Sequence, residues 1–275
     1  MNSIVNIARR QASSGGGATP ANPDFVSTWD TTQAGSASDT IVLPMTAGPT
    51  VHWGDGNSDT TNTHTYASGG VYTVTIEGAV TTFRFNNSGD RRKIVDISNW
   101  GGFDVSNNSI FRGCSNLDIS STDYPIISTT NLSYTFLNCS SLTTPNFSNW
   151  DTSSVTKFTS CFQSCSNFNS PLDGWVHSGV TALSTMMSGC GSFNQDLDTW
   201  DVSGATSAST FMRYCTSFNG NTTGWVLQGN WTTAFRNTNS FVGTGANTWD
   251  TSAVTNMSYM FANNSPFDQN ISTWD

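Results

Sequence analysis

The stretch WDTSAVTNMSYMF at residues 249–261 decides the fold, because its opening pair and its apolar spacing return throughout the second half of the chain. An aromatic residue, followed by Asp in four of eight cases, recurs after 24 to 26 residues, at Trp100, Tyr124, Trp150, Trp175, Trp200, Trp225, Trp249 and Trp274. A period this regular is typical of repeat proteins, in which each unit covers the apolar face of the next. Repeats of this kind build surface, so we expect recognition or scaffolding rather than catalysis.

Within each unit, the apolar residues follow the spacing of one helical face. Counted from the aromatic residue as position zero, they stand at offsets 8, 11, 12 and 15, as in Phe158, Cys161, Phe162 and Cys165. This i, i+3, i+4, i+7 spacing predicts a helix of two turns in every unit. Further apolar residues at offsets 18 and 22 predict extended chain, and the Asp residues that follow Trp150 and Trp200 are candidate caps for the helix.

Residues 193–203, FNQDLDTWDVS, together with residues 249–261, closely resemble the BspA-type leucine-rich-repeat surface proteins, and the likeness extends over residues 99–275. The resemblance implies a right-handed leucine-rich-repeat-like solenoid of about seven 25-residue coils. It also implies a role in adhesion or partner binding. The unit at residues 225–249 departs most, since it lacks the cysteine of its neighbours and Trp231 is out of pattern, so we expect local distortion there.

Residues 24–98 predict a small β domain, because runs of β-branched and aromatic residues alternate with turn residues. The stretch VHWGDG at residues 51–56, with His64, Tyr66 and residues 70–74, resembles the PKD-type immunoglobulin-like domain. That resemblance implies a spacer or contact surface without enzymatic activity. The predicted fold class is therefore α+β, an immunoglobulin-like β domain followed by the leucine-rich-repeat-like solenoid.

Residues 1–23 are predicted to be a docking tip on a tether. Apolar Ile4, Val5 and Ile7 precede Arg9 and Arg10, and a Ser/Gly/Ala/Pro stretch follows. A secretory signal has its charges before the apolar run, so export by that route is not indicated. We expect the tip to dock into a virion; a terminus without a role is the alternative.

The composition argues against two kinds of partner. The formal net charge is −9 and the pI is about 4.5. An acidic chain does not suit the phosphate backbone of nucleic acid, which requires clustered Lys and Arg. No apolar run approaches the roughly 18 residues of a membrane-spanning helix, so no membrane insertion is expected.

No catalytic residue, metal site or cofactor is expected. Five cysteines share one repeat position and predict a column of buried free thiols: Cys114, Cys139, Cys165, Cys190 and Cys215. His52 and His64 could face each other across a hairpin, but packing is the favoured interpretation. Asp151, Asp201 and Asp250 recur once per unit at turns, which favours capping over acid–base chemistry.

The tryptophan column offers a candidate binding surface, because aromatic rings flanked by Asp, Asn and Thr can stack on sugars. Corner packing within the repeat is the competing and favoured interpretation of Trp150, Trp175, Trp200, Trp225 and Trp249. The leading hypothesis is a non-enzymatic phage virion component, a fibre or capsid-decoration protein on the virion surface. It would bind other virion proteins through its N-terminus and a host-surface protein or glycan through the repeats. The alternatives are a bacterial cell-surface adhesin of the BspA type and, less favoured, a polysaccharide-cleaving enzyme; a homo-oligomer stays open.

Overall fold

The computed structural model describes residues 24–275, and this part of the chain opens with a six-stranded sheet of order β10-β8-β1-β6-β3-β4. Its strands are β1 (Phe25–Asp30), β3 (Val51–His52), β4 (Ser58–Asp59), β6 (Val71–Ile76), β8 (Ile94–Asn99) and β10 (Asp118–Ile119). Neighbouring strands are antiparallel except β10 and β8, which are parallel. Buried and partly exposed residues alternate along β1, as expected for a strand with one face on the core.

The remaining strands form three smaller sheets. An antiparallel pair joins β2 (Thr40–Val42) to β5 (Thr63–Thr65). A parallel three-stranded sheet contains β7 (Ala79–Val80), β9 (Gly102–Val105) and β11 (Ile126–Ile127). Near the C-terminus a parallel pair joins β12 (Val226–Asn230) to β13 (Asp250–Asn256), with the 3-10 helix η1 (Ala246–Thr248) between them in sequence.

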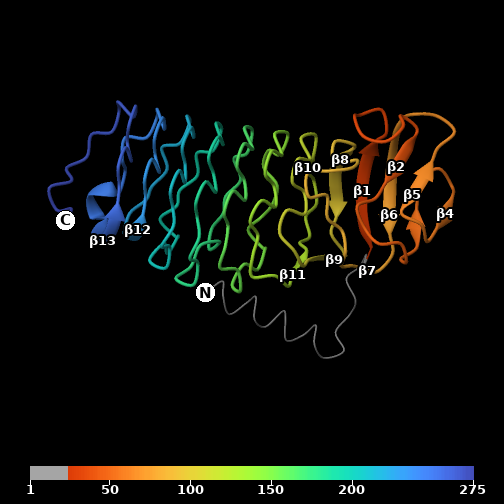
Figure 1. Cartoon of the computed structure of the whole chain (residues 1–275), viewed down its shortest axis with the longest axis horizontal. Coiled ribbons are helices and arrows are strands. Elements are labelled where there is room, and N and C mark those ends of the chain that lie inside the picture. The colour runs from red at the N-terminus through yellow and green to blue at the C-terminus, as the bar shows by residue number, and fades with distance from the viewer. Residues whose placement is uncertain (1–23) are drawn as a thin grey trace.

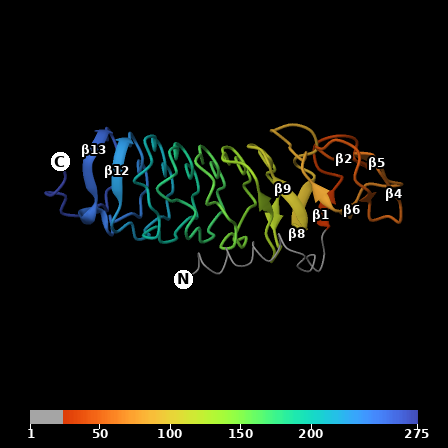
Figure 2. The same cartoon turned by 90° about the horizontal axis from the view of Figure 1, so that it is seen from below.

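Successive windows of the repeat lie side by side along the long axis of the molecule (Figures 1 and 2). We call each window, from one recurring aromatic residue to the next, a rung. Equivalent residues of neighbouring rungs form parallel bridges, which join Asn131 to Lys157, Lys157 to Ala182, Ala182 to Ser207, and Ser207 to Asn230. The 25-residue period of the sequence is therefore the length of chain between hydrogen-bonded equivalents.

The two-turn helix predicted in every rung is wrong, because η1 is the only helix among residues 24–275. In the rung that begins at Trp150, alternate backbone N–H groups donate at 2.8–3.0 Å to carbonyls of the next rung, from Phe158, Ser160, Phe162 and Ser164. Between them, the N–H groups of Cys161 and Gln163 donate to carbonyls three residues back within the rung. An α-helix instead directs every N–H four residues back. The segment is thus two successive turns whose other hydrogen bonds join rung to rung.

Two left-handed residues in each rung enforce these turns. Thr185 has a φ of 61° and Gly189 a φ of 81°, and the same pair of positions is left-handed at Thr210 and Tyr214 in the next rung. A left-handed residue is incompatible with a continuing right-handed helix. The residues between the two positions still point inward, so the apolar spacing of a helix is also satisfied by this double turn.

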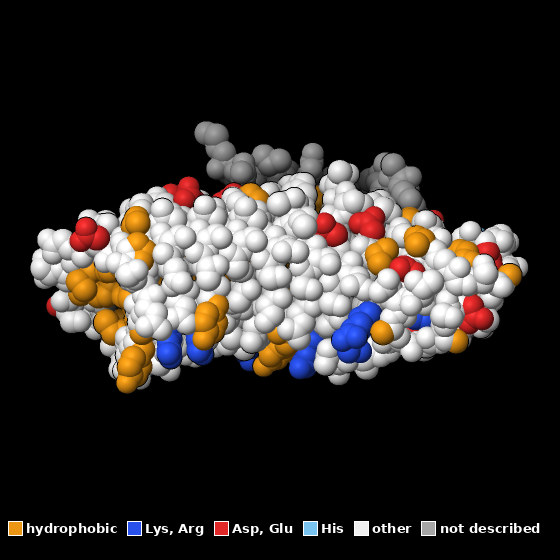
Figure 3. All heavy atoms as spheres, turned by 90° about the horizontal axis from the view of Figure 1, so that it is seen from above, with side chains coloured by type: hydrophobic (Ala, Val, Ile, Leu, Met, Phe, Trp, Pro, Cys, Tyr) orange, Lys and Arg blue, Asp and Glu red, His pale blue; other side chains and the backbone are white. Residues whose placement is uncertain are grey.

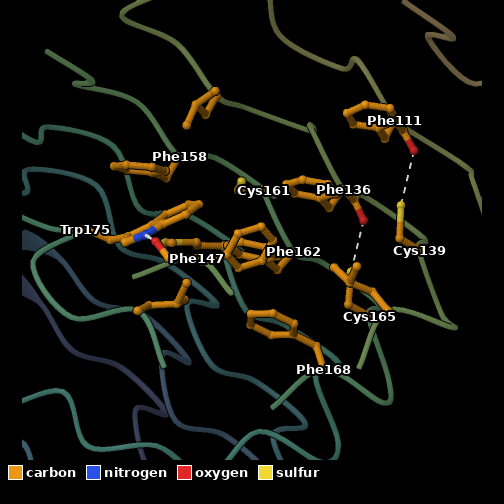
Figure 4. Close-up of a cluster of buried hydrophobic side chains, with 14 of the residues drawn as sticks. Phe111, Phe136, Cys139, Phe147, Phe158, Cys161, Phe162, Cys165, Phe168 and Trp175 are labelled. Carbon is orange, nitrogen blue, oxygen red and sulfur yellow. Dashed lines mark hydrogen bonds between the residues drawn. The ribbon is translucent and has the colours of Figure 1, made fainter. Parts of the chain in front are cut away.

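Columns of equivalent side chains fill the interior (Figure 4). Phe111 stacks on Phe136 at 5.7 Å between ring centroids, and Phe136 on Phe162 at 5.4 Å, with interplanar angles of 10° and 6°. A second column stacks Phe168 on Phe193 at 5.9 Å. Each ring is buried by its equivalent in the neighbouring rung, so no rung completes its core alone.

The predicted fold class is corrected by these observations. Residues 24–275 are built from strands in several small sheets and from turns, so the α+β class and the leucine-rich-repeat-like solenoid with its helices are wrong. The boundary expected between residues 98 and 99 lies at the end of β8, and hydrogen bonding continues across it. There β8 pairs with β10, β7 with β9, and Phe85 N–H donates to the carbonyl of Ile110.

Candidate binding surface

The recurring tryptophans pack inside the molecule at one corner of each rung. Trp150, Trp175, Trp200, Trp225 and Trp249 are each at most 5% exposed. From Trp175 on, each indole Nε1 donates at 2.8–3.2 Å to a carbonyl 27 or 28 residues earlier, and the last such donor is Trp274. Rings that are buried and hydrogen-bonded in this way offer no face to a sugar. Corner packing therefore accounts for the column, and these tryptophans are not the surface that meets a ligand.

The column is interrupted at Tyr124, the one recurring aromatic residue that is not tryptophan. Its side chain is 42% exposed, and Trp150 instead packs edge-on against Trp100 at 5.4 Å. The Nε1 of Trp150 has no hydrogen-bond partner, unlike the indoles that follow it. Tyrosine at residue 124 thus interrupts both the stacking and the hydrogen bonding of the tryptophan column.

The recurring aspartates are turn caps. Asp151 accepts hydrogen bonds from the N–H and the hydroxyl of Ser153, and Asp201 and Asp250 repeat this arrangement with the serine two residues on. The hydrogen bond from the Ser252 hydroxyl lowers the pKa of Asp250. These carboxylates stand in every second rung and are held by their own turns, so they do not converge on a common point. The arrangement favours a structural role over acid–base chemistry.

Asparagines form a second ladder along the rungs. The side-chain oxygen of Asn169 accepts from the N–H of Asn194 at 2.9 Å, and Asn194 accepts likewise from Asn219 at 2.8 Å. Asn219 in turn accepts from Val242 at 3.0 Å. The side-chain oxygens of these asparagines therefore form hydrogen bonds between rungs.

All six cysteines are free and buried. In the repeat column, each thiol from Cys139 on donates to a carbonyl of the preceding rung, as Cys190 does to Phe162 at 3.0 Å and Cys215 to Met187 at 3.0 Å. Thr238 stands at the next position, where its hydroxyl lies 3.3 Å from the carbonyl of Met212 in the preceding rung and 2.8 Å from that of Phe235 in its own rung. Burial raises the pKa of every one of these thiols, to about 12 for Cys165. Protonated thiols of this kind are poor nucleophiles and poor metal ligands.

The histidines do not face each other as the sequence suggested. His52 pairs with Glu77 and His64 with Asp55, each at 2.8 Å. His64 also stacks on Trp53, with ring centroids 5.0 Å apart. Although burial opposes it, hydrogen bonds from His64 and Asn57 lower the pKa of Asp55 to about 2. Within residues 24–275 no three potential ligands gather in a way that could hold a metal ion.

Arginines and tyrosines instead collect along the edge of double turns. Arg112, Arg213 and Arg236 share one repeat position, since the residue that follows each of them is the second left-handed residue of its double turn. The left-handed positions themselves carry three tyrosines, Tyr134, Tyr214 and Tyr259. We call these six residues the Arg–Tyr edge. Tyr214 is 45% exposed and Tyr259 72% exposed.

The guanidinium groups of this edge are held by packing but lack carboxylate partners. The ion pairs within the described part of the chain are those of His52 and His64, so none neutralises Arg112, Arg213 or Arg236. Arg112 lies over the ring of Tyr134 at 5.5 Å and Arg213 over that of Tyr214 at 4.6 Å. The Nε atoms of all three arginines are buried without a hydrogen-bond partner. Buried donors without partners are rare in folded proteins, which marks this edge as a candidate site.

Sequence reasoning missed this edge. Counted from the recurring aromatic residue, the three arginines stand at offsets 12, 13 and 11, so the aromatic period does not align them. They share one position only when the register is set by the left-handed residues of the double turns. The predicted docking residues Ile4, Val5, Ile7, Arg9 and Arg10 lie outside the described residues.

Comparison with known proteins gives one finding. A family model described as "Mycoplasma protein of unknown function, DUF285" matches residues 130–242 and again residues 229–275, together more than half of the chain. No curated protein and no solved structure matches. The matched region excludes residues 24–98 and its description names neither a PKD domain nor a phage, so the identification as a phage-encoded leucine-rich-repeat protein with a PKD-like domain is wrong. No helix within residues 24–275 is long and apolar enough to cross a bilayer.

Proposed function

The chain belongs to this DUF285 family, and on that premise we propose that it is a non-enzymatic binding or structural protein displayed on a surface. The observation that carries the proposal is the use of the recurring polar groups. The aspartates cap turns, the asparagines and cysteines bond rung to rung, and the tryptophans brace the corner. What the repeat adds with each rung is exposed area rather than a reactive centre. Extended surfaces of stacked repeats are suited to binding large partners.

A virion surface and a bacterial cell surface are the two locations between which an experiment can decide. Antibody labelling of intact particles and of intact cells, followed by electron microscopy, would place the protein on one of them. Label found only inside lysed cells would contradict surface display altogether. Deletion of residues 1–23 tests the virion location further, because loss of the protein from purified particles is expected if that segment docks it.

The non-enzymatic part of the proposal has its own test. Purified protein incubated with acidic and neutral polysaccharides should leave the viscosity of the solution unchanged over hours. A fall in viscosity that grows with protein concentration would show chain cleavage. That result would replace a binding function by a glycan-degrading one.

A further inference from the structure

We infer that the Arg–Tyr edge is a binding site for an acidic polysaccharide, with its carboxylate groups on Arg112, Arg213 and Arg236 and its sugar rings against the tyrosines. The inference rests on the proposed function, to which it adds a site and a class of ligand. It starts from the three guanidinium groups that have no carboxylate partner within residues 24–275.

Charge is divided between the two long edges of the molecule. On the face shown in Figure 3 the Lys and Arg side chains lie along one edge, and most Asp and Glu side chains lie toward the other edge or at the ends. The repeat explains the division, because Asp151, Asp201 and Asp250 stand at offset 1 whereas Arg213 stands at offset 13, half a rung away. An acidic protein thus keeps one locally cationic edge, to which an anion would be directed.

The arginines suit carboxylates in geometry as well as in charge. A guanidinium presents planar, forked donors that match a carboxylate in a bidentate contact. Packing against Tyr214 fixes the Arg213 group, whose terminal nitrogen also donates to the tyrosine hydroxyl at 2.9 Å. A side chain already held in place loses less conformational entropy when it binds.

The spacing along the edge favours a polymer that carries well-separated charges. Arg213 and Arg236 occupy neighbouring rungs, because the N–H of Tyr214 donates to the carbonyl of Arg236. Arg112 stands four rungs before Arg213, which is about 19 Å at the usual strand spacing of about 4.8 Å. Positions between them carry uncharged residues, including Gln163 and Ser188.

A glycan fits this pattern better than a nucleic acid does. Nucleic acid binding depends on many phosphate contacts, whereas this edge offers three arginines on a chain of net charge −9. The exposed rings of Tyr214 and Tyr259 provide amphipathic faces that can contact sugar rings, while their hydroxyls can hydrogen-bond. Carboxylates and sugar rings in one polymer would use both residue types.

The experiment measures binding of the full chain to alginate and polygalacturonate, with dextran as the neutral polymer and polyphosphate as a non-glycan polyanion. Biolayer interferometry should show binding to the two polyuronates that weakens with added salt. No binding to dextran is expected. Failure to bind either polyuronate, equal binding to dextran, or binding to polyphosphate alone would each overturn the inference.

Variants locate the site. Arg213→Gln combined with Arg236→Gln should weaken polyuronate binding at least tenfold, since two charge-assisted contacts are lost. The matched control, Ser148→Asp with Asn247→Asp, changes the net charge by the same amount at the position where Asp173 and Asp198 stand in other rungs. It should leave the affinity within about threefold, since it lies far from the edge. Equal loss in both pairs would show a non-specific charge effect and contradict the site.

A gain of affinity provides a test that does not depend on loss of function. Gln163→Arg adds a fourth guanidinium to the same column and should tighten binding several-fold. Unchanged or weaker binding by this folded variant would contradict the site. Surface display combined with no polyuronate binding would refute this inference and leave the proposed function standing. Polyuronate binding by a protein found only inside cells would refute surface display and leave the binding site standing.

Discussion

Lys93 shows how a single buried charge organises the start of the molecule. Its side chain is fully buried, and its Nζ donates to the carbonyls of Ser36, Ala37 and Thr40 at 2.7–3.1 Å. Asp90 accepts hydrogen bonds from the N–H groups of Ser36 and Val42, so Lys93 and Asp90 together fix the connection between β1 and β2. Burial lowers the pKa of Lys93, an effect that nearby carboxylates oppose.

Replacement of Lys93 by Met should lower the free energy of unfolding by about 3–5 kcal/mol, because it leaves three carbonyls buried without their donor and the buried Asp90 without its nearby positive charge. Urea denaturation followed by tryptophan fluorescence measures the change. Lys157→Met removes an exposed lysine and should stay within about 0.5 kcal/mol of the parent. A small effect at Lys93, equal to that at Lys157, would contradict the bracing role.

Two glycines two residues apart should respond in opposite directions to alanine. Gly189 is left-handed, and an added Cβ would meet only Ser164 at an ordinary 3.5 Å, so Gly189→Ala should cost about 1 kcal/mol through backbone strain alone. Gly191 is not left-handed and has similar free space, so Gly191→Ala should gain about 0.4–1 kcal/mol. Thermal unfolding of the two variants checks the pair. A change of stability with the same sign in both variants would show that the backbone φ does not determine the effect of alanine.

At the scale of the element, the sequence specified the period but not the conformation within it. The apolar offsets 8, 11, 12 and 15 fit a helix and a double turn equally well, since both bury the same residues. Glycine at residue 189 or asparagine at residue 138 hints at a left-handed backbone at the second position of the double turn, yet the first left-handed position carries Thr185 and Thr210. β-Branched residues are poor predictors of such a backbone, because they rarely adopt it. The deciding hydrogen bonds run between rungs, where local propensity carries no information.

The same limit applies to the candidate site. The recurrence of the tryptophans was visible in the sequence and corner packing was its favoured interpretation, but the pattern alone did not exclude rings that face outward. The arginines became significant only when the double turn placed their column beside the exposed tyrosines. Sequence alone gave no reason to join Arg213 with Tyr259, which lies in a later rung.

The cysteine column predicts a loss of stability at alkaline pH. In the unfolded chain the thiols ionise near the ordinary cysteine pKa of 9.0, whereas in the fold their raised pKa keeps them protonated. Their contribution is fully present below pH 9 and declines as the pH rises toward the folded values, by about 1.4 kcal/mol per pH unit for each thiol. Urea unfolding at pH 8 and pH 10 measures this slope.

Cys215→Thr is the matched variant for that measurement, because Thr238 already fills the equivalent position in the next rung. It should fold normally at pH 8. Between pH 8 and pH 10 its free energy of unfolding should fall less than that of the parent, by the contribution of one thiol. An identical decline in parent and variant would mean that other groups cause the alkaline effect.

For the whole molecule, the rung predicts which changes of length the fold tolerates. Deletion of residues 176–200 joins Trp175 to Asp201 and restores the Trp–Asp pair, so every column stays in register. We expect a folded protein whose urea m-value is lower by about a tenth, in proportion to the surface removed. Deletion of residues 177–200 is one residue shorter and misaligns the columns, so it should aggregate or unfold. Circular dichroism and urea titration distinguish the two, and equal tolerance would contradict fixed register.

The ladder of N–H groups from one double turn to the next also has a mechanical consequence. A force that separates the two ends of the molecule loads these junctions in series, so the weakest gives way while the others stay intact. Each release frees one rung of 25 residues, which lengthens the chain by about 85 Å at about 3.4 Å per residue. Under tension the protein would therefore behave as an extensible tether that absorbs work in repeated steps.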